Sequence, residues 1–139
     1  MDKKDKYKFM SKVIFIASEK QLNLKQLGIM QIIPNEYFKQ HYPYLKDKKY
    51  IYDFEGFNRS ISYKELIHYL LEKIDEENAI AFIIMKQTDN IDEITSYNSK
   101  IKHKNVIDIS NDNEKIYDLI YRLETNSLLS STAYVLTQD

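Results

Sequence analysis

The most constraining feature of this sequence is an unbroken run of apolar residues at Ala79–Met85. A strand with one face in water alternates apolar and polar side chains, so a continuous run predicts a strand that is buried on both faces. The run is far shorter than the ~20 residues that span a membrane. Val13–Ala17 has the same character and is rich in β-branched residues. We therefore expect a sheet with Ala79–Met85 at its centre and protein packed on both of its sides.

Further segments complete the predicted sheet and its helices. Apolar residues spaced by three and four positions predict two main helices, at about 62–75 and 112–124. Both begin with a capping-box pattern, at Ser62 and at Asn111. The other expected elements are short helical segments at Asn35–Tyr42 and within 88–99, and strands at Leu27–Ile33, Tyr50–Phe54, Val106–Ile109 and Ala133–Leu136.

This order of elements predicts an α/β or α+β fold with a mixed sheet of about five to six strands, covered by the two main helices. Helices alternate with apolar strands from residue 62 onward, which favours at least one parallel pair. Tyr50–Phe54 and Ala133–Leu136 are the expected edge strands. A chain of 139 residues is most simply one domain. We place that domain at 12–139 and interpret 1–11 as a flexible basic arm.

Charge is divided along the chain. Residues 1–64 hold 13 Lys and Arg against 7 Asp and Glu, whereas residues 65–139 hold 7 against 14. The net charge of −1 therefore hides two oppositely charged halves. Because strands from both halves are expected to share one sheet, we interpret the split as an acidic domain that carries one basic, aromatic segment.

Composition excludes several classes of site. The chain has no cysteine, so it forms no disulfide and no zinc–thiolate site. Gly28 and Gly56 are its only glycines, too few and too far apart for a phosphate-binding loop. The N-terminus lacks the apolar core of a signal peptide, and no segment is long enough to cross a membrane. A cytoplasmic protein with no membrane partner is expected, and the Ile, Lys, Asn and Tyr bias suggests a low-GC bacterium or a phage.

No catalytic, metal-binding or cofactor-binding residues are predicted. The spacing of His41, His68 and His103 does not fit a metal motif. Asp53 and Glu55 would point the same way at a strand end, as metal-binding carboxylates do. However, the Glu-x-Lys pattern that accompanies such acids in nucleases is missing.

Polar residues at strand ends support an alternative hypothesis of a small-ligand-binding or enzymatic domain. Gln87–Asp89 and Asp108–Ser110 lie at the C-terminal ends of two predicted strands, and open α/β sheets bind ligands at that edge. Capping of loops and helices is the favoured role for these residues. The four candidates for such a site are Ser18, Asp53, Asp89 and Asp108.

The acidic half offers a candidate surface for a protein partner. Its acids gather after the first main helix and after the central strand. An acidic patch can steer and cover a basic active site, such as that of a nuclease. The candidate partner-binding residues are Asp75, Glu76, Glu77, Asp89, Asp92 and Glu93.

Residues 37–63 form an alternative basic and aromatic patch. Rings interleaved with cations suit unpaired bases, and Tyr-rich surfaces also suit protein partners. A Tyr-rich composition with half of the rings in the core is the simplest explanation. The patch residues are Tyr44, Lys46, Lys48, Lys49, Tyr52 and Arg59. The edge strand expected at Tyr50–Phe54 could also pair across a two-fold axis to form a homodimer.

The favoured hypothesis is a small, non-catalytic binding protein that inhibits a protein partner by electrostatic occlusion. Immunity proteins, antitoxins and phage anti-defence proteins have this profile, and a basic toxin or nuclease would be the partner. A nucleic-acid-binding accessory protein is a further alternative. The acidic second half of the chain argues against a dedicated nucleic-acid binder.

Overall fold

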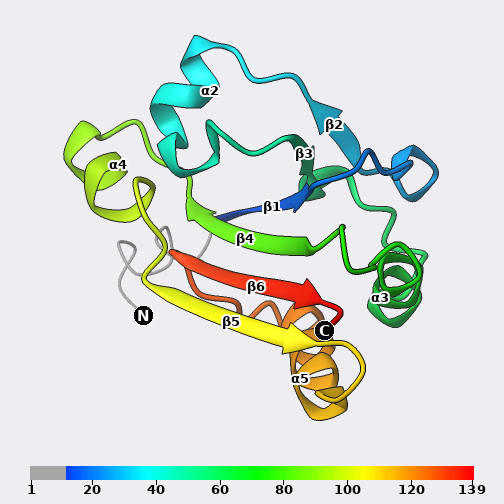
Figure 1. Cartoon of the computed structure of the whole chain (residues 1–139). Coiled ribbons are helices and arrows are strands. Elements are labelled where there is room, and N and C mark those ends of the chain that lie inside the picture. The colour runs from blue at the N-terminus through cyan, green and yellow to red at the C-terminus, as the bar shows by residue number, and fades with distance from the viewer. Residues whose placement is uncertain (1–11) are drawn as a thin grey trace.

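The computed structural model describes residues 12–139, which fold around a six-stranded sheet (Figure 1). Residues 1–11 lie outside the described part, so the flexible arm stays a prediction. The strands are β1 (Lys12–Ser18), β2 (Met30–Ile32), β3 (Tyr50–Asp53), β4 (Ile80–Lys86), β5 (His103–Asp108) and β6 (Thr132–Thr137). Their order in the sheet is β2-β3-β1-β4-β6-β5. The pair β5–β6 is parallel and the other pairs are antiparallel, which confirms the predicted mixed sheet.

Strand β4 lies inside the sheet, as its apolar run predicts. It pairs with β1 on one side and with β6 on the other. Phe82 and Ile84 pack in one hydrophobic core. Ile83 and Met85 pack in a second core on the opposite face. Burial on both faces therefore explains why the run has no polar interruption.

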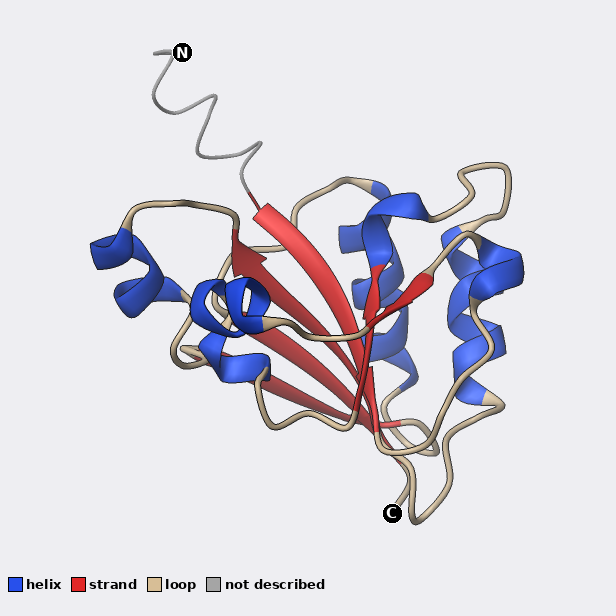
Figure 2. Ribbon diagram, turned by 90° about the horizontal axis from the view of Figure 1, so that it is seen from above, coloured by secondary structure: helices blue, strands red, loops and turns tan. Residues whose placement is uncertain are grey.

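Helices lie on both sides of the sheet (Figure 2). The two main helices, α3 (Tyr63–Leu71) and α5 (Asn113–Glu124), contribute to the larger core, and we name their side the covered face. The opposite side, named the open face, carries α2 (Glu36–His41), the 3₁₀ turn η2 (Pro43–Leu45) and α4 (Ile91–Tyr97). Two further 3₁₀ turns, η1 (Lys25–Leu27) and η3 (Phe54–Gly56), lie in connections.

The start of one main helix follows the sequence pattern and the start of the other does not. The Ser62 side chain accepts a hydrogen bond from the Glu65 N–H at 3.1 Å, as a capping box requires. At α5 the capping residue is Asp112, whose side chain makes no cap bond to the helix. Its Oδ2 instead accepts from the Asp108 N–H at 2.9 Å. The prediction of a cap at Asn111 is therefore wrong, because these polar side chains close the turn after β5.

Both predicted edge strands are wrong. Strand β3 lies between β2 and β1, and β6 lies between β4 and β5, so the edges are β2 and β5. The crossover through α5 places β6 inside the sheet, next to the strand that precedes it. Strand β5 also begins at His103, three residues before the predicted Val106. Its first residues are polar because an edge strand keeps them in solvent.

The two glycines lie against each other. Gly28 has a φ of 82°, in the left-handed region that favours glycine. A Cβ atom on Gly28 would collide with the carbonyl oxygen of Gly56. The Asn58 N–H donates to the Leu27 carbonyl at 2.8 Å beside this contact. The turn after η1 is thereby held against the turn at η3.

Candidate binding surface on the open face of the sheet

The six predicted acidic residues do not form one patch. Asp75, Glu76 and Glu77 lie in the turn that precedes β4, whereas the other three lie at the start of α4, beyond the end of β4. Strand β4 has seven residues. At about 3.3 Å per residue the strand separates the two groups by roughly 20 Å. Figure 1 shows the connection from α3 and helix α4 at opposite ends of the sheet.

Three of these acids lie within 4 Å of a lysine, and a fourth lies beside a histidine ring. Lys20 Nζ lies 3.4 Å from Asp75 and 3.6 Å from Glu77. The Glu77 N–H and Lys20 lower the pKa of the Asp75 carboxyl. Lys86 Nζ lies 3.1 Å from Glu93, and the ring of His41 lies 3.3 Å from Asp89. The negative charge that remains for a basic partner is therefore divided and partly compensated.

The basic and aromatic residues are also divided, but four of them stay together. Tyr44 lies in η2, and Lys46, Lys48 and Lys49 follow it before β3 begins. Arg59 lies elsewhere, over the rings of Phe54, Phe57 and Tyr63 at 5.6 to 5.9 Å.

Tyr52 does not belong to this surface, because only 1 % of it is exposed. Its position in β3 directs the ring toward the covered face. The Tyr52 hydroxyl accepts from the Leu22 N–H at 2.6 Å and donates to the Leu22 carbonyl at 3.2 Å. Tyr52 therefore holds the loop after β1 in place.

The open face has a shallow groove next to Tyr44, Lys48 and Lys49. Its cavity volume is about 120 Å³. Small side chains from neighbouring strands form its floor, because Ala17, Ala81 and Val135 lie in register across β1, β4 and β6. The other residues that line it are Ser18, Glu19, Ala79, Ile83, Lys104 and Ala133.

The floor continues as an apolar strip toward the edge of the sheet. Val106 of β5 lies in register with Val135 and is 48 % exposed. Ala81 and Val135 are only half-buried, although they lie on inner strands. This part of the open face is therefore an apolar surface that no helix of the described residues covers.

Three lysines surround the groove. Within residues 12–139, no ion pair includes Lys48, Lys49 or Lys104. Glu19 is the acid that lines the same groove, so the rim is basic overall. Lys48 lies 4.9 Å from the centre of the Tyr44 ring, and Lys49 lies 5.8 Å from that of Tyr50. Each of these rings thus has one face occupied by a lysine of the same chain.

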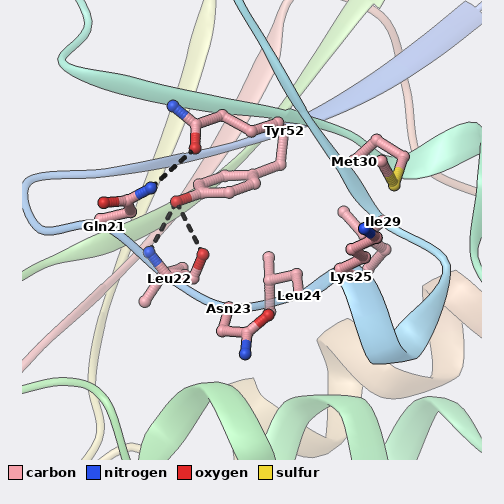
Figure 3. Close-up of a pocket in the computed structure, with 9 residues that line it drawn as sticks. Gln21, Leu22, Asn23, Leu24, Lys25, Ile29, Met30 and Tyr52 are labelled. Carbon is pink, nitrogen blue, oxygen red and sulfur yellow. Dashed lines mark hydrogen bonds between the residues drawn. The ribbon is translucent and has the colours of Figure 1, made fainter.

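A second hollow lies beside the edge strand β2 and is shown in Figure 3. Its volume is about 470 Å³, and Leu22, Leu24 and Ile29 supply apolar walls. Its polar groups are largely bonded to one another. Gln21 donates to Gln31 at 3.2 Å, and the Tyr52 hydroxyl is used by the backbone of Leu22. We assign this hollow a structural role, because these groups already hold the loop against β2.

A third hollow, of about 220 Å³, lies where β1 begins and contains Lys12, Glu55 and Arg59. Lys12 donates from Nζ to the carbonyls of Asn126 and Leu128 at 2.8 and 2.7 Å. Partial burial lowers the pKa of Lys12. This lysine therefore joins β1 to the loop after α5.

The strand-end residues do not converge on a site. Strands β4 and β5 run in opposite directions, so Asp89 and Asp108 lie at opposite ends of the sheet. The Asp108 carboxylate accepts from the Ser110 N–H at 3.0 Å and from Asn111 Nδ2 at 2.6 Å, and these bonds lower its pKa. Asp53 accepts from the Glu55 N–H at 2.9 Å at the start of η3. Both acids act in turns, which was the favoured expectation for Asp108.

Asp53 and Glu55 do not form the predicted carboxylate pair, because β3 ends at Asp53 and the chain turns into η3. Within residues 12–139, no group of three His, Asp or Glu side chains could hold a metal ion. None of the helices in this range is long and apolar enough to span a membrane.

The sequence pattern did not predict that Lys104 and the small side chains of the groove floor would belong to the site. The signal was the small size of Ala17, Ala81 and Ala133 inside strands that otherwise carry large apolar residues. Their alignment depends on the strand register, which the sequence pattern did not supply. Comparison of the chain with models of known protein families, with curated proteins and with solved structures finds no match.

Proposed function

We propose that this chain is a non-catalytic binding protein whose open face binds an acidic segment of a protein partner. The observation that carries the proposal is the groove on that face. It combines a floor of small apolar side chains with a rim of three lysines that have no acidic partner within residues 12–139. An apolar centre with a polar, solvent-accessible rim is the usual anatomy of a protein interface.

The dimensions of the groove favour a protein segment over a small ligand. Pockets for small molecules usually enclose about 300–1,000 Å³. The groove has about 120 Å³ and is continuous with the exposed Val106. An extended segment can lie across such a strip and place acidic side chains beside Lys48, Lys49 and Lys104.

Single-stranded nucleic acid fits the surface less well. Sequence-tolerant binding of single strands uses aromatic rings on which bases stack. The floor of the groove is aliphatic, and Tyr44 and Tyr50 each carry a lysine over one ring face. The chain also has a net charge of −1, which does not favour a polyanion.

We keep inhibition by occlusion in the proposal. Here, however, the chain supplies the positive charge and the partner supplies the negative charge. A chain that covers an acidic segment of its partner would block whatever that segment does. The hypothesis of a basic toxin or nuclease as partner stays a prediction. It has less structural support, because its six acids lie in two groups and most of them have a lysine or a histidine ring nearby.

The test measures the affinity of the full chain for a labelled peptide in which glutamate alternates with valine. Fluorescence anisotropy should show binding that weakens with salt. The triple variant Lys48→Ala, Lys49→Ala, Lys104→Ala should bind at least about tenfold more weakly, because three charge contacts are lost.

The matched control replaces three lysines that are also exposed, Lys25, Lys64 and Lys73, with alanine. This control changes the net charge by the same amount but leaves the groove intact, so its affinity should match that of the unmodified chain. Equal losses in the two triple variants would contradict the proposal. Tighter binding of oligo(dT) than of the peptide would favour a nucleic-acid function instead.

A further inference from the structure

Strand β5 has an open edge of restricted length. It pairs with β6 on one side, and no strand within residues 12–139 lies on the other. In a parallel pair, the N–H and C=O of one residue point to the same side, and successive residues alternate. The His103 N–H donates at 3.1 Å to the carbonyl of Ser131, the residue before β6. The Ile109 N–H donates at 2.9 Å to the carbonyl of Thr137 in β6. Odd-numbered residues therefore face β6, and even-numbered residues face outward.

At the C-terminal end of this edge, the outward backbone groups already have hydrogen-bond partners. The outward N–H of Asp108 donates to Asp112 Oδ2 at 2.9 Å, and its carbonyl accepts from the N–H groups of Asn111 and Asp112. Two outward residues remain in the strand, Lys104 and Val106. Together they present two N–H donors and two C=O acceptors, with Asn105 between them.

We propose that β5 pairs with β5 of a second copy, antiparallel, across a two-fold axis at Asn105. In this register Lys104 of each copy lies opposite Val106 of the other. Such opposed pairs exchange two hydrogen bonds each, so all of the outward groups of Lys104 and Val106 become bonded. The two neighbouring registers do not do this. One pairs Lys104 with Asp108, whose outward groups are already bonded, and the other pairs Val106 with Lys102, whose N–H donates to the Ser131 carbonyl at 2.8 Å.

Side chains support the same register. Lys102, which precedes β5 and is exposed, falls opposite Asp108 of the second copy, so opposite charges meet at both ends of the ladder. The two Asn105 side chains meet at the axis, where their amides can exchange hydrogen bonds. The aliphatic part of Lys104 covers Val106, which is 48 % exposed in the single chain.

The pairing would join two sheets into one continuous sheet. A two-fold axis perpendicular to the sheet keeps the open faces of both copies on the same side. The two grooves then share one surface with Lys104 of each copy near its centre. The inference does not rest on the proposed function, because the ladder uses backbone groups that peptide binding does not involve.

The test is the mass of the full chain in solution, measured by sedimentation velocity over a concentration series from micromolar to millimolar. We expect a reversible dimer. Val106→Lys should raise the dissociation constant by roughly tenfold, because it places two like-charge pairs in the ladder. Circular dichroism should show that the fold of this variant is unchanged.

A compensating change tests the register itself. Adding Lys104→Glu to Val106→Lys should restore the dimer, because residue 104 of one copy faces residue 106 of the other. A monomer at every concentration would overturn the proposal. It would also be overturned by a dimer that Val106→Lys leaves unaffected, or by a double variant that remains monomeric while folded.

Discussion

Two buried asparagines join segments that are distant in the sequence. Asn78 Oδ1 accepts from the Ser18 hydroxyl at 2.9 Å, and its Nδ2 donates to the Lys73 carbonyl at 2.9 Å. It also accepts from the N–H groups of Glu19 and Lys20 at 3.1 Å. Asn78 thus fixes the end of α3 against the end of β1, and the acidic turn of Asp75–Glu77 is built around this contact.

Asn98 has the same role at the other end of β4. Its side chain accepts from the Lys86 N–H at 3.0 Å and donates to the carbonyls of Lys86 and His41 at 2.7 and 2.9 Å. The Asn98 carbonyl accepts from the Tyr44 N–H at 3.0 Å. Through these bonds the segment that carries Tyr44 and the groove lysines is attached to the central strand.

We expect Asn78→Ala to lower the free energy of unfolding by about 2–4 kcal/mol, because it leaves several buried donors and acceptors unpaired. Urea denaturation monitored by circular dichroism measures the change. Asn23→Ala is the control, since Asn23 is exposed and should change stability by less than about 0.5 kcal/mol. Equal effects of the two substitutions would show that the buried network contributes little.

Tyr42 should make the fold sensitive to alkaline pH. Burial is the largest of the causes that raise its pKa to about 12. In the unfolded chain the pKa is about 10. The unfolded state then loses its proton first as pH rises, so stability is fully present below pH 10 and declines between pH 10 and 12. With solvent screening discounted, the loss is about 1 kcal/mol.

Tyr42→Phe keeps the ring that packs on Phe15 at 4.9 Å and Phe38 at 5.2 Å between centres. Its stability at pH 7 should therefore match that of the unmodified chain, and its decline above pH 10 should be shallower. Urea midpoints measured from pH 7 to pH 11.5 test this expectation. Parallel declines in the two proteins would mean that Tyr42 does not titrate differently on folding.

At the scale of elements, the sequence predicted the strands and helices whose pattern of apolar residues comes from local burial. The apolar run of β4 and the three-and-four spacing in α3 and α5 each correspond to an observed element. Strand β5 was only partly predicted, because His103–Asn105 are polar and exposed at the edge. The edge strands were misassigned, because strand order depends on long-range pairing that local pattern does not encode.

The candidate site was predicted only in its basic part. Tyr44, Lys48 and Lys49 are close in sequence, so their common surface could be inferred from composition. Lys104 and the alanine floor come from strands far apart in the chain and meet only through register. The six acids do not form one patch, because β4 separates their two groups. In the sequence these groups are only a dozen residues apart.

Substitutions at the contact between Gly28 and Gly56 should be among the most destabilising in this fold. Gly28→Ala forces a side chain into the left-handed region and against the Gly56 carbonyl. We expect a loss of about 3 kcal/mol or more in the free energy of unfolding. Gln26→Ala, at an exposed position in η1, is the control and should be nearly neutral. A small effect at Gly28, seen by urea denaturation, would mean that the two turns separate easily.

At the scale of the whole molecule, the charge split along the sequence is also a division of the sheet. Strands β2, β3 and β1 come from the first half and lie on one side, and β4, β6 and β5 come from the second half. The halves meet along the β1–β4 pair. An ion pair joins Lys20 to Asp75 across this boundary, and the ring of His41 lies 3.3 Å from Asp89. The Lys20–Asp75 pair is exposed to solvent, which screens the attraction, so it adds little to stability.

The division leaves one basic region on an otherwise acidic domain. The lysines that follow η2 have no ion-pair partner within residues 12–139, and Lys104 from the second half joins them on the open face. The covered face is closed by α3 and α5, whose buried residues belong to the larger core. A partner therefore has an accessible apolar surface on the open face, beside the lysines.

The most direct test of this account is a methyl NMR titration of the alanine- and valine-labelled chain with the glutamate–valine peptide. The account predicts that the methyl signals of Ala17, Ala81, Ala133 and Val135 shift together with the bound fraction. A methyl outside the groove, such as that of Val13, should not move. The account is contradicted if the groove signals stay unchanged at saturating peptide, or if the peptide shifts signals elsewhere and not in the groove.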